Sequence, residues 1–305
     1  MDSPAKQPTI ERPRYRKPRG ADRLVRMTGL WRLHGNTLPP ALNRRYRKFH
    51  RQAQAAFTGE RHESFAREAA QLHEEGLCHA GRGLDPAKAR DLSERLTNLI
   101  SAGGPQIHQH HQGLYRLNDP LDALGTQCLD LLDGPAGRIL EAHYGSHFRI
   151  EWVDCYRTYA GAERKTSWLW HIDNVPAGSL KVMLLLTDST RETGAMRYLP
   201  RETTHALRRA GYFGVRLSER ELSLEVFARR AALKLEPQYR EAPAGDVLLF
   251  DPNILHCGEP PLRGHRDVMT FFIVPSLVPW REALKLTGTA HVQSSPGGYP
   301  SSPAL

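Results

Sequence analysis

The hydrophobic pattern of this 305-residue chain changes its period once, close to Gly145, and this change limits the fold more than any other feature. Over residues 63–144, apolar residues recur at the three- and four-residue spacing of amphipathic helices. Over residues 147–276, short apolar runs that include Phe148 and Ile150 alternate with polar residues at the spacing of strands. A block of helices followed by a block of short strands predicts an α+β fold.

Charge, proline and glycine divide the chain into three parts. Residues 1–55 are basic and are expected to form a flexible arm. Residues 56–286 are expected to form one domain, whose strands are interrupted by a charged, helical insertion at about 205–241. Residues 287–305 are rich in Ser, Pro and Gly and are expected to form a flexible tail.

Two of the expected helices begin with the same signal, an aspartate followed by proline, at Asp85-Pro86 and at Asp119-Pro120. Aspartate is a favoured N-cap residue, and proline suits the first position of a helix. We therefore expect both aspartates to cap helices.

The net charge of +9 lies in the N-terminal part of the chain, where the first 50 residues hold 13 Lys and Arg against 3 Asp and Glu. Such a segment can contact phosphates, so it either binds a nucleic acid or another anionic partner or is a solvated extension. No apolar run reaches the roughly 18 residues of a membrane span, and none forms a secretory signal. The four cysteines form no CxxC pair, so we expect reduced thiols in a cytoplasmic protein.

One constellation of residues carries chemistry. On a strand or at its end, residues i and i+2 point the same way, so His171 and Asp173 can bind one metal. A third ligand, His256, follows the apolar strand 246–250 and a turn. Two histidines and one carboxylate form the facial triad of non-haem Fe(II) sites, which leaves positions open for substrate and O2. Ten residues further on, Arg266 opens a strand on which its guanidinium could hold a carboxylate in bidentate fashion.

The chain also holds a second His-x-Asp sequence, His265-Arg266-Asp267. We reject it as a metal site because His291, in the expected tail, is the one histidine downstream of it. With 15 histidines in the chain, a His-x-Asp alone is weak evidence. The prediction rests on the conjunction of that motif with the later histidine and the arginine.

With these residues in place, the sequence resembles the Fe(II)/2-oxoglutarate-dependent dioxygenases, specifically the phytanoyl-CoA dioxygenase (PhyH)-like branch. The resemblance covers roughly residues 63–276, and the stretches 180–188 and 192–200 are similar to the family's strand, acidic turn, glycine and strand-to-proline sequence. It implies a double-stranded β-helix, jelly-roll- or cupin-like, with the helices packed outside it. It also implies Fe(II) and O2 as cofactors and 2-oxoglutarate as co-substrate.

The same resemblance assigns roles to residues. His171, Asp173 and His256 would be the iron ligands, and Arg266 would bind the distal carboxylate of 2-oxoglutarate. Thr158 matches a position where relatives often have an asparagine that binds this co-substrate.

What the resemblance implies for activity is hydroxylation of an unactivated C–H bond of a small organic substrate, with release of succinate and CO2. Relatives that halogenate replace the carboxylate ligand with a small residue, so the presence of Asp173 favours hydroxylation. The chain departs from its relatives at Gly258, where they commonly have a small hydroxyl residue.

Two other classes of function stay open at this point. The same His/Asp/His set could hold zinc in a hydrolase. Alternatively, the β-helix could be non-catalytic, and the basic arm could bind nucleic acid or an anionic surface.

Overall fold

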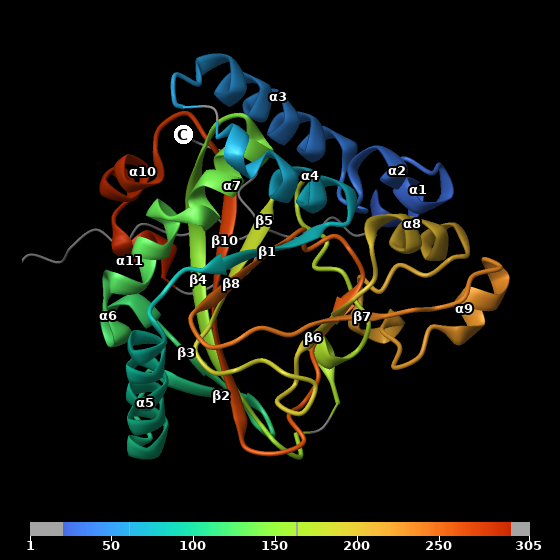
Figure 1. Cartoon of the computed structure of the whole chain (residues 1–305). Coiled ribbons are helices and arrows are strands. Elements are labelled where there is room, and N and C mark those ends of the chain that lie inside the picture. The colour runs from blue at the N-terminus through green and yellow to red at the C-terminus, as the bar shows by residue number, and fades with distance from the viewer. Residues whose placement is uncertain (1–20, 61, 163, 294–305) are drawn as a thin grey trace, which may run out of the picture.

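The computed structural model describes residues 21–60, 62–162 and 164–293 of the chain (Figure 1). Its strands are β1 (Leu77–Arg82), β2 (Ile107–His111), β3 (Leu114–Leu117), β4 (His147–Tyr159), β5 (Leu180–Leu185), β6 (Met196–Tyr198), β7 (Gln238–Arg240), β8 (Asp246–Phe250), β9 (His256–Cys257) and β10 (His265–Ser276).

The helices fall into an N-terminal group, an insertion between strands and a C-terminal pair. The α-helices are α1 (Ala21–Met27), α2 (Trp31–His34), α3 (Pro40–Ala56), α4 (Ala66–Glu74), α5 (Pro86–Ala102), α6 (Pro120–Leu124), α7 (Pro135–Tyr144), α8 (Arg201–Arg209), α9 (Glu225–Arg230), α10 (Trp280–Thr287) and α11 (Thr289–Val292). Short 3-10 helices are η1 (Glu63–Phe65), η2 (Thr126–Asp133), η3 (Thr166–Trp168) and η4 (Leu217–Glu219).

The strands make two antiparallel sheets. The large sheet has the order β1-β8-β5-β10-β4-β3-β2, and the small sheet has the order β7-β6-β9. The small sheet is continued by the loop after β4, because His171 forms an isolated bridge with His256 on β9. Two antiparallel sheets with helices outside them are the arrangement expected of a jelly roll. The predicted α+β fold class is confirmed.

The large sheet uses its two faces differently, because side chains alternate along a strand. On β5, Val182 and Leu184 belong to the main hydrophobic core beneath the helices. Their neighbours Lys181 and Met183 point the opposite way, into a cavity. The same alternation along β10 sends Phe271 into the core. One face of the sheet therefore stabilises the fold, while the other lines a site.

The helices cover the core face of the large sheet. In Figure 1, α6, α7, α10 and α11 lie beside β4, and each of these helices contacts that strand. The core beneath them includes Leu92 and Leu96 of α5 and Leu140 of α7. This layer is built from the apolar positions whose helical spacing is visible in the sequence.

Only one of the two Asp-Pro signals produces a side-chain cap. Asp85 accepts a hydrogen bond from the backbone N–H of Ala87 at 2.8 Å, as expected of an N-cap. Asp119 precedes α6 but makes no such bond. Its backbone φ is +49°, in the left-handed region, whereas a capping residue has extended dihedrals. The expected capping role of Asp119 is therefore wrong, although Pro120 does begin a helix.

The described part of the expected basic arm is helical. Residues 21–56 form α1, α2 and α3, and Trp31 and Tyr46 are buried. The side-chain oxygen of Asn43 accepts hydrogen bonds from the Asn36 side chain at 3.0 Å and from the Ala177 backbone at 3.1 Å. Most basic residues of α3 are exposed around this buried face. Because so many charged residues surround the few buried ones, the helical period of α3 is difficult to recognise in the sequence. Residues 1–20 lie outside the described residues.

Other parts of the chain also differ from the sequence expectation in detail. The region 63–144 contains strands β1, β2 and β3 as well as helices. The insertion holds α8 and α9 but returns to the small sheet through β7. In the expected tail, α11 ends at the buried Val292, and residues 294–305 lie outside the described part.

Within the described residues no helix is long and apolar enough to cross a membrane. The four cysteines are free thiols, and all of them are buried.

Candidate metal centre

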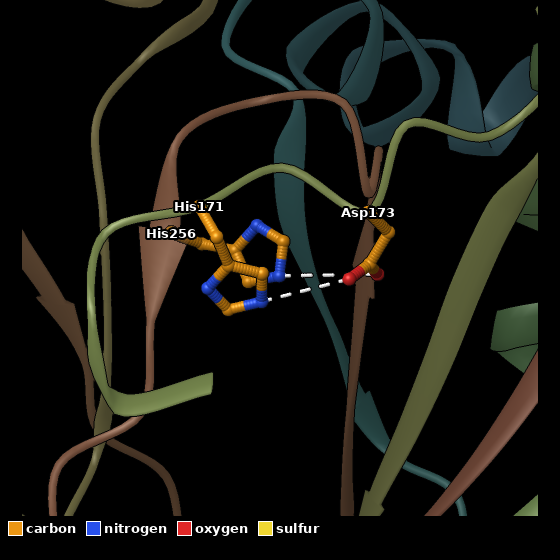
Figure 2. Close-up of side chains that lie close together, drawn as sticks. All are labelled: His171, Asp173 and His256. Atoms are coloured by element: carbon orange, nitrogen blue, oxygen red, sulfur yellow. Dashed lines mark ion pairs between the residues drawn. The ribbon is translucent and has the colours of Figure 1, made fainter. Parts of the chain in front are cut away.

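His171, Asp173 and His256 converge at the small sheet (Figure 2). Nε2 of His171 lies 3.5 Å from Oδ1 of Asp173, and Nε2 of His256 lies 4.0 Å from Oδ2 of the same carboxylate. One ligand atom from each residue lies within 4.8 Å of the other two. Figure 2 shows both imidazoles facing this carboxylate. The structure thus brings together the three side chains that the sequence singled out.

Backbone hydrogen bonds set the protonation of both imidazoles. Nδ1 of His171 lies 2.8 Å from the carbonyl of Leu169, and Nδ1 of His256 lies 2.9 Å from the carbonyl of Ile254. A carbonyl only accepts, so each Nδ1 carries the hydrogen and donates it. In a neutral ring this leaves the Nε2 lone pair free, and it faces Asp173.

The electrostatics keep these groups in the forms that bind a cation. Burial, and next the neighbouring His171, lower the pKa of His256 to about 3, and burial also lowers the pKa of His171. Burial alone would raise the pKa of Asp173, but Lys181 and the two histidines hold it well below its usual value. Two neutral imidazoles and one carboxylate result. This is the donor set of a facial triad.

Lys181 on β5 is the nearest cation to this carboxylate. Its Nζ lies 2.7 Å from Oδ2 of Asp173. Burial tends to lower the pKa of Lys181, but the charge of Asp173 more than offsets this and raises it. A single ammonium group thus holds one carboxylate oxygen and leaves the other turned toward His171.

A cavity of about 270 Å3 lies in front of the three side chains, between the two sheets. The large sheet contributes Arg116 of β3, Lys181 of β5 and Arg266 of β10 to its wall, and the small sheet contributes Met196 of β6. A concave pocket in which polar groups converge is the usual form of a small-molecule site.

Thr158 and Arg266 are directly opposite each other on β4 and β10. Residues paired in this way on antiparallel strands project from the same face, so both side chains reach the cavity. Arg266 is 4% exposed, and its Nε has no hydrogen-bond partner; the fully buried Oγ1 of Thr158 has none either. Buried polar atoms are almost always paired in folded proteins, so both side chains have a donor available for a ligand in the cavity.

Gly258 departs from the family pattern for a steric reason. A Cβ at this position would lie 2.9 Å from Cδ1 of Trp168 and 3.5 Å from Nη2 of Arg266. The buried indole of Trp168 therefore fills the space that a hydroxyl residue would need.

The second His-x-Asp sequence has a structural role. Asp267 is fully buried and accepts hydrogen bonds from Nε of Arg157 at 2.7 Å and from Oγ of Ser93 at 2.6 Å. Its side chain points to the helix side of the sheet, because it neighbours Arg266 on the same strand. Among the described residues it joins no group that could hold a metal.

Sequence reasoning missed Arg220, which also lines the cavity. It lies in the charged insertion, 49 positions after His171, with no motif around it. The backbone carbonyl of Glu221 accepts a hydrogen bond from Trp170 at 2.9 Å, and this contact brings the insertion beside the His-x-Asp segment. A contact between such distant segments leaves no signal in a single sequence.

Residues 165–262 match the family model of phytanoyl-CoA dioxygenase (PhyH). The matched segment includes His171, Asp173 and His256, and it ends before Arg266.

Among solved structures, the fold is similar to that of SnoK, described as a non-heme alpha ketoglutarate dependent carbocyclase from nogalamycin biosynthesis. The TM-score is 0.53 at 16% identity, and the match covers 78% of this chain and 92% of SnoK. It is also similar to the epimerase SnoN in complex with Fe3+, alpha ketoglutarate and nogalamycin RO. Here the TM-score is 0.51 at 17% identity, over 70% of this chain and 84% of SnoN. At these identities the likeness concerns the fold. No curated protein sequence gives a significant match.

Proposed function

We propose, from the premise that this chain is a PhyH-like Fe(II)/2-oxoglutarate-dependent oxygenase, that it hydroxylates an unactivated C–H bond of a small organic substrate. One oxygen atom of O2 enters the substrate as a hydroxyl group, and the other enters succinate as 2-oxoglutarate loses CO2. The observation that carries the proposal is the convergence of His171, Asp173 and His256 on one point.

The donor set fits a ferrous ion. Both imidazoles offer Nε2 in the neutral form, and Asp173 supplies one negative charge. Three protein ligands leave open positions for a co-substrate and O2, and bound iron supplies the redox chemistry. In this proposal the chain itself fixes the ligands: the carbonyls of Leu169 and Ile254 orient the two rings, and Lys181 orients the carboxylate.

The pair formed by Thr158 and Arg266 fits 2-oxoglutarate. Arg266 lines the same cavity as the three candidate ligands, and its guanidinium suits bidentate binding of the far carboxylate of a dicarboxylate held there. The same group would accept a hydrogen bond from Oγ1 of Thr158. This ligand would satisfy two buried polar atoms that have no partner in the protein alone.

Hydroxylation is the outcome that we propose among those that the fold supports. Asp173 provides a carboxylate at the position where halogenating relatives have a small residue. SnoK and SnoN are described as a carbocyclase and an epimerase, so ring closure and epimerisation are alternative outcomes for this architecture. The mass of the product distinguishes them, because only hydroxylation adds one oxygen atom to the substrate.

The test is incubation of the purified protein with Fe(II), 2-oxoglutarate, O2 and a cell metabolite extract, followed by mass spectrometry. We expect one metabolite to gain an oxygen atom, with succinate formed in equal amount. His171→Ala should abolish both changes. The matched control His291→Ala, an exposed histidine of α11, should leave them intact.

Three results would overturn the proposal. One is the absence of iron-dependent succinate with every fraction of the extract. Another is a product formed with zinc in the absence of O2, which would indicate a hydrolase. A product of unchanged mass, or one lighter by two hydrogens, would replace hydroxylation with epimerisation or cyclisation.

A further inference from the structure

The cavity carries an excess of positive charge. Its wall includes the cations Arg116, Lys181, Arg220 and Arg266 and the carboxylates Asp154 and Asp173, a formal balance of +2 with histidines counted as neutral. A ferrous ion and the 2-oxoglutarate dianion cancel each other in this count. The excess of +2 therefore remains when the iron and the 2-oxoglutarate that the proposed function requires are bound. The primary substrate would then enter a positively charged cavity.

Three of the four cations have an anion assigned to them. Lys181 lies 2.7 Å from Asp173, and Arg116 lies 3.9 Å from Asp154. Arg266 has the proposed carboxylate of 2-oxoglutarate. Arg220 has no carboxylate within ion-pair distance in the part of the chain that the structure describes.

The guanidinium of Arg220 is held at the cavity but is incompletely hydrogen-bonded. Its Nη1 donates to the carbonyl of Thr166 at 3.0 Å, whereas its Nε is buried without a partner. The next residue, Glu221, bridges to Trp170, which directly precedes His171, so Arg220 lines the cavity near its metal-binding end. Leaving buried N–H groups of a cation unpaired is costly, and a planar guanidinium is matched best by an oxyanion.

We propose that Arg220 binds the anionic head group, a carboxylate or a phosphate, of a small primary substrate. This inference rests on the proposed function and names the substrate class of the same site. The size of the cavity supports it, because about 270 Å3 is below the usual range of roughly 300–1,000 Å3 for ligand pockets and is shared with 2-oxoglutarate. A small anion fits this space, and its charge offsets the excess of positive charge.

The experiment measures the binding of simple probes to the full chain loaded with Mn(II) in place of iron and with 2-oxoglutarate, so that no turnover occurs. Paramagnetic broadening of probe proton signals by NMR reports binding near the metal. Butyrate is compared with its neutral isostere butyramide, and ethyl phosphate is the second anionic probe.

We expect butyrate or ethyl phosphate to bind more tightly than butyramide, and the tighter of the two anions identifies the head group. Arg220→Gln should weaken the preferred anion about tenfold, the size of one lost charge-assisted hydrogen bond. Binding of 2-oxoglutarate should be unchanged in this variant. The matched control Arg216→Gln removes a guanidinium from the same segment that pairs with Asp22 outside the cavity, and it should change nothing.

Two results would overturn the inference in distinguishable ways. If the protein binds Mn(II) and 2-oxoglutarate but binds butyramide as tightly as both anions, or if Arg220→Gln binds them as the wild type does, Arg220 is not a substrate subsite and the proposed function stands. If the protein takes up neither Mn(II) nor 2-oxoglutarate, the proposed function fails, and this inference fails with it.

Discussion

Replacing Asp267 by Asn tests whether a buried ion pair holds the pocket strands to the helical layer. Asp267 of β10 and Arg157 of β4 are 0% and 1% exposed. Their two contacts, Nε to Oδ1 and Nη2 to Oδ2, measure 2.7 and 2.5 Å. Ser93 of α5 joins both partners, donating to Asp267 at 2.6 Å and accepting from Arg157 at 3.0 Å. The pair adjoins Thr158 and Arg266 in sequence, so it fixes the strand segments that carry the proposed co-substrate contacts.

The expected magnitude follows from this burial. Asn keeps one oxygen acceptor but removes the charge, so the guanidinium of Arg157 is left buried without a counter-charge. Removing one partner of a buried pair costs about 3–5 kcal/mol, a large part of the roughly 5–15 kcal/mol of net stability of a typical protein. Urea unfolding followed by circular dichroism measures the loss in unfolding free energy.

The control is Arg281→Gln, which breaks exposed pairs with Asp130 and Asp133 and should cost less than about 1 kcal/mol. The double variant Arg157→Met with Asp267→Leu should lose less stability than Asp267→Asn alone, because no charge is left buried. A loss for Asp267→Asn as small as that of the control would refute the reasoning.

Three further changes test other parts of the structure. Lys181→Met frees one oxygen of Asp173 and should weaken Mn(II) binding by about 10- to 100-fold in calorimetry, and unchanged affinity would show that the ammonium does not orient this ligand. Gly258→Ala places a Cβ 2.9 Å from Trp168 and 3.5 Å from the guanidinium of Arg266, so this crowding should weaken 2-oxoglutarate binding. An unchanged dissociation constant would mean that the indole moves aside without disturbing the site. Burial lowers the pKa of His143 from 6.5 to about 4, so between these values the unfolded chain binds a proton that the folded chain does not. Unfolding free energy should fall as pH drops from 6.5 to 4, and His143→Gln should flatten this fall in urea titrations; an identical slope in both proteins would argue against it.

The features that could be predicted from the sequence are those that depend on residues close together in the chain. The change from a helical to a strand period near Gly145 and the apolar faces of α5 and α7 can be read directly, because each depends on spacing within one element. The His-x-Asp pair and the later histidine were also found by spacing, and the structure brings them together. The interpretation of Asp119 as a cap was wrong, because its backbone adopts a left-handed conformation that the Asp-Pro signal does not reveal.

The features that escaped prediction depend on contacts between distant segments. The helix α3 was hidden because basic residues surround a buried face that includes Asn43 and Tyr46. Arg220 is held at the pocket by contacts with distant segments, the bridge of Glu221 to Trp170 and its own hydrogen bond to Thr166. The significance of Gly258 depends on the position of Trp168, which no spacing in the sequence indicates.

The central claim, that His171, Asp173 and His256 hold one ferrous ion to which 2-oxoglutarate is then added, can be measured by calorimetric titration under argon. Fe(II) should bind the wild-type chain at one site, and 2-oxoglutarate should bind afterwards, only to the iron-loaded protein. His171→Ala, Asp173→Ala and His256→Ala should each lose both binding steps, while Arg266→Met should keep the first and weaken the second. Iron bound equally well by the three ligand variants, or 2-oxoglutarate bound equally well without iron, would contradict the claim.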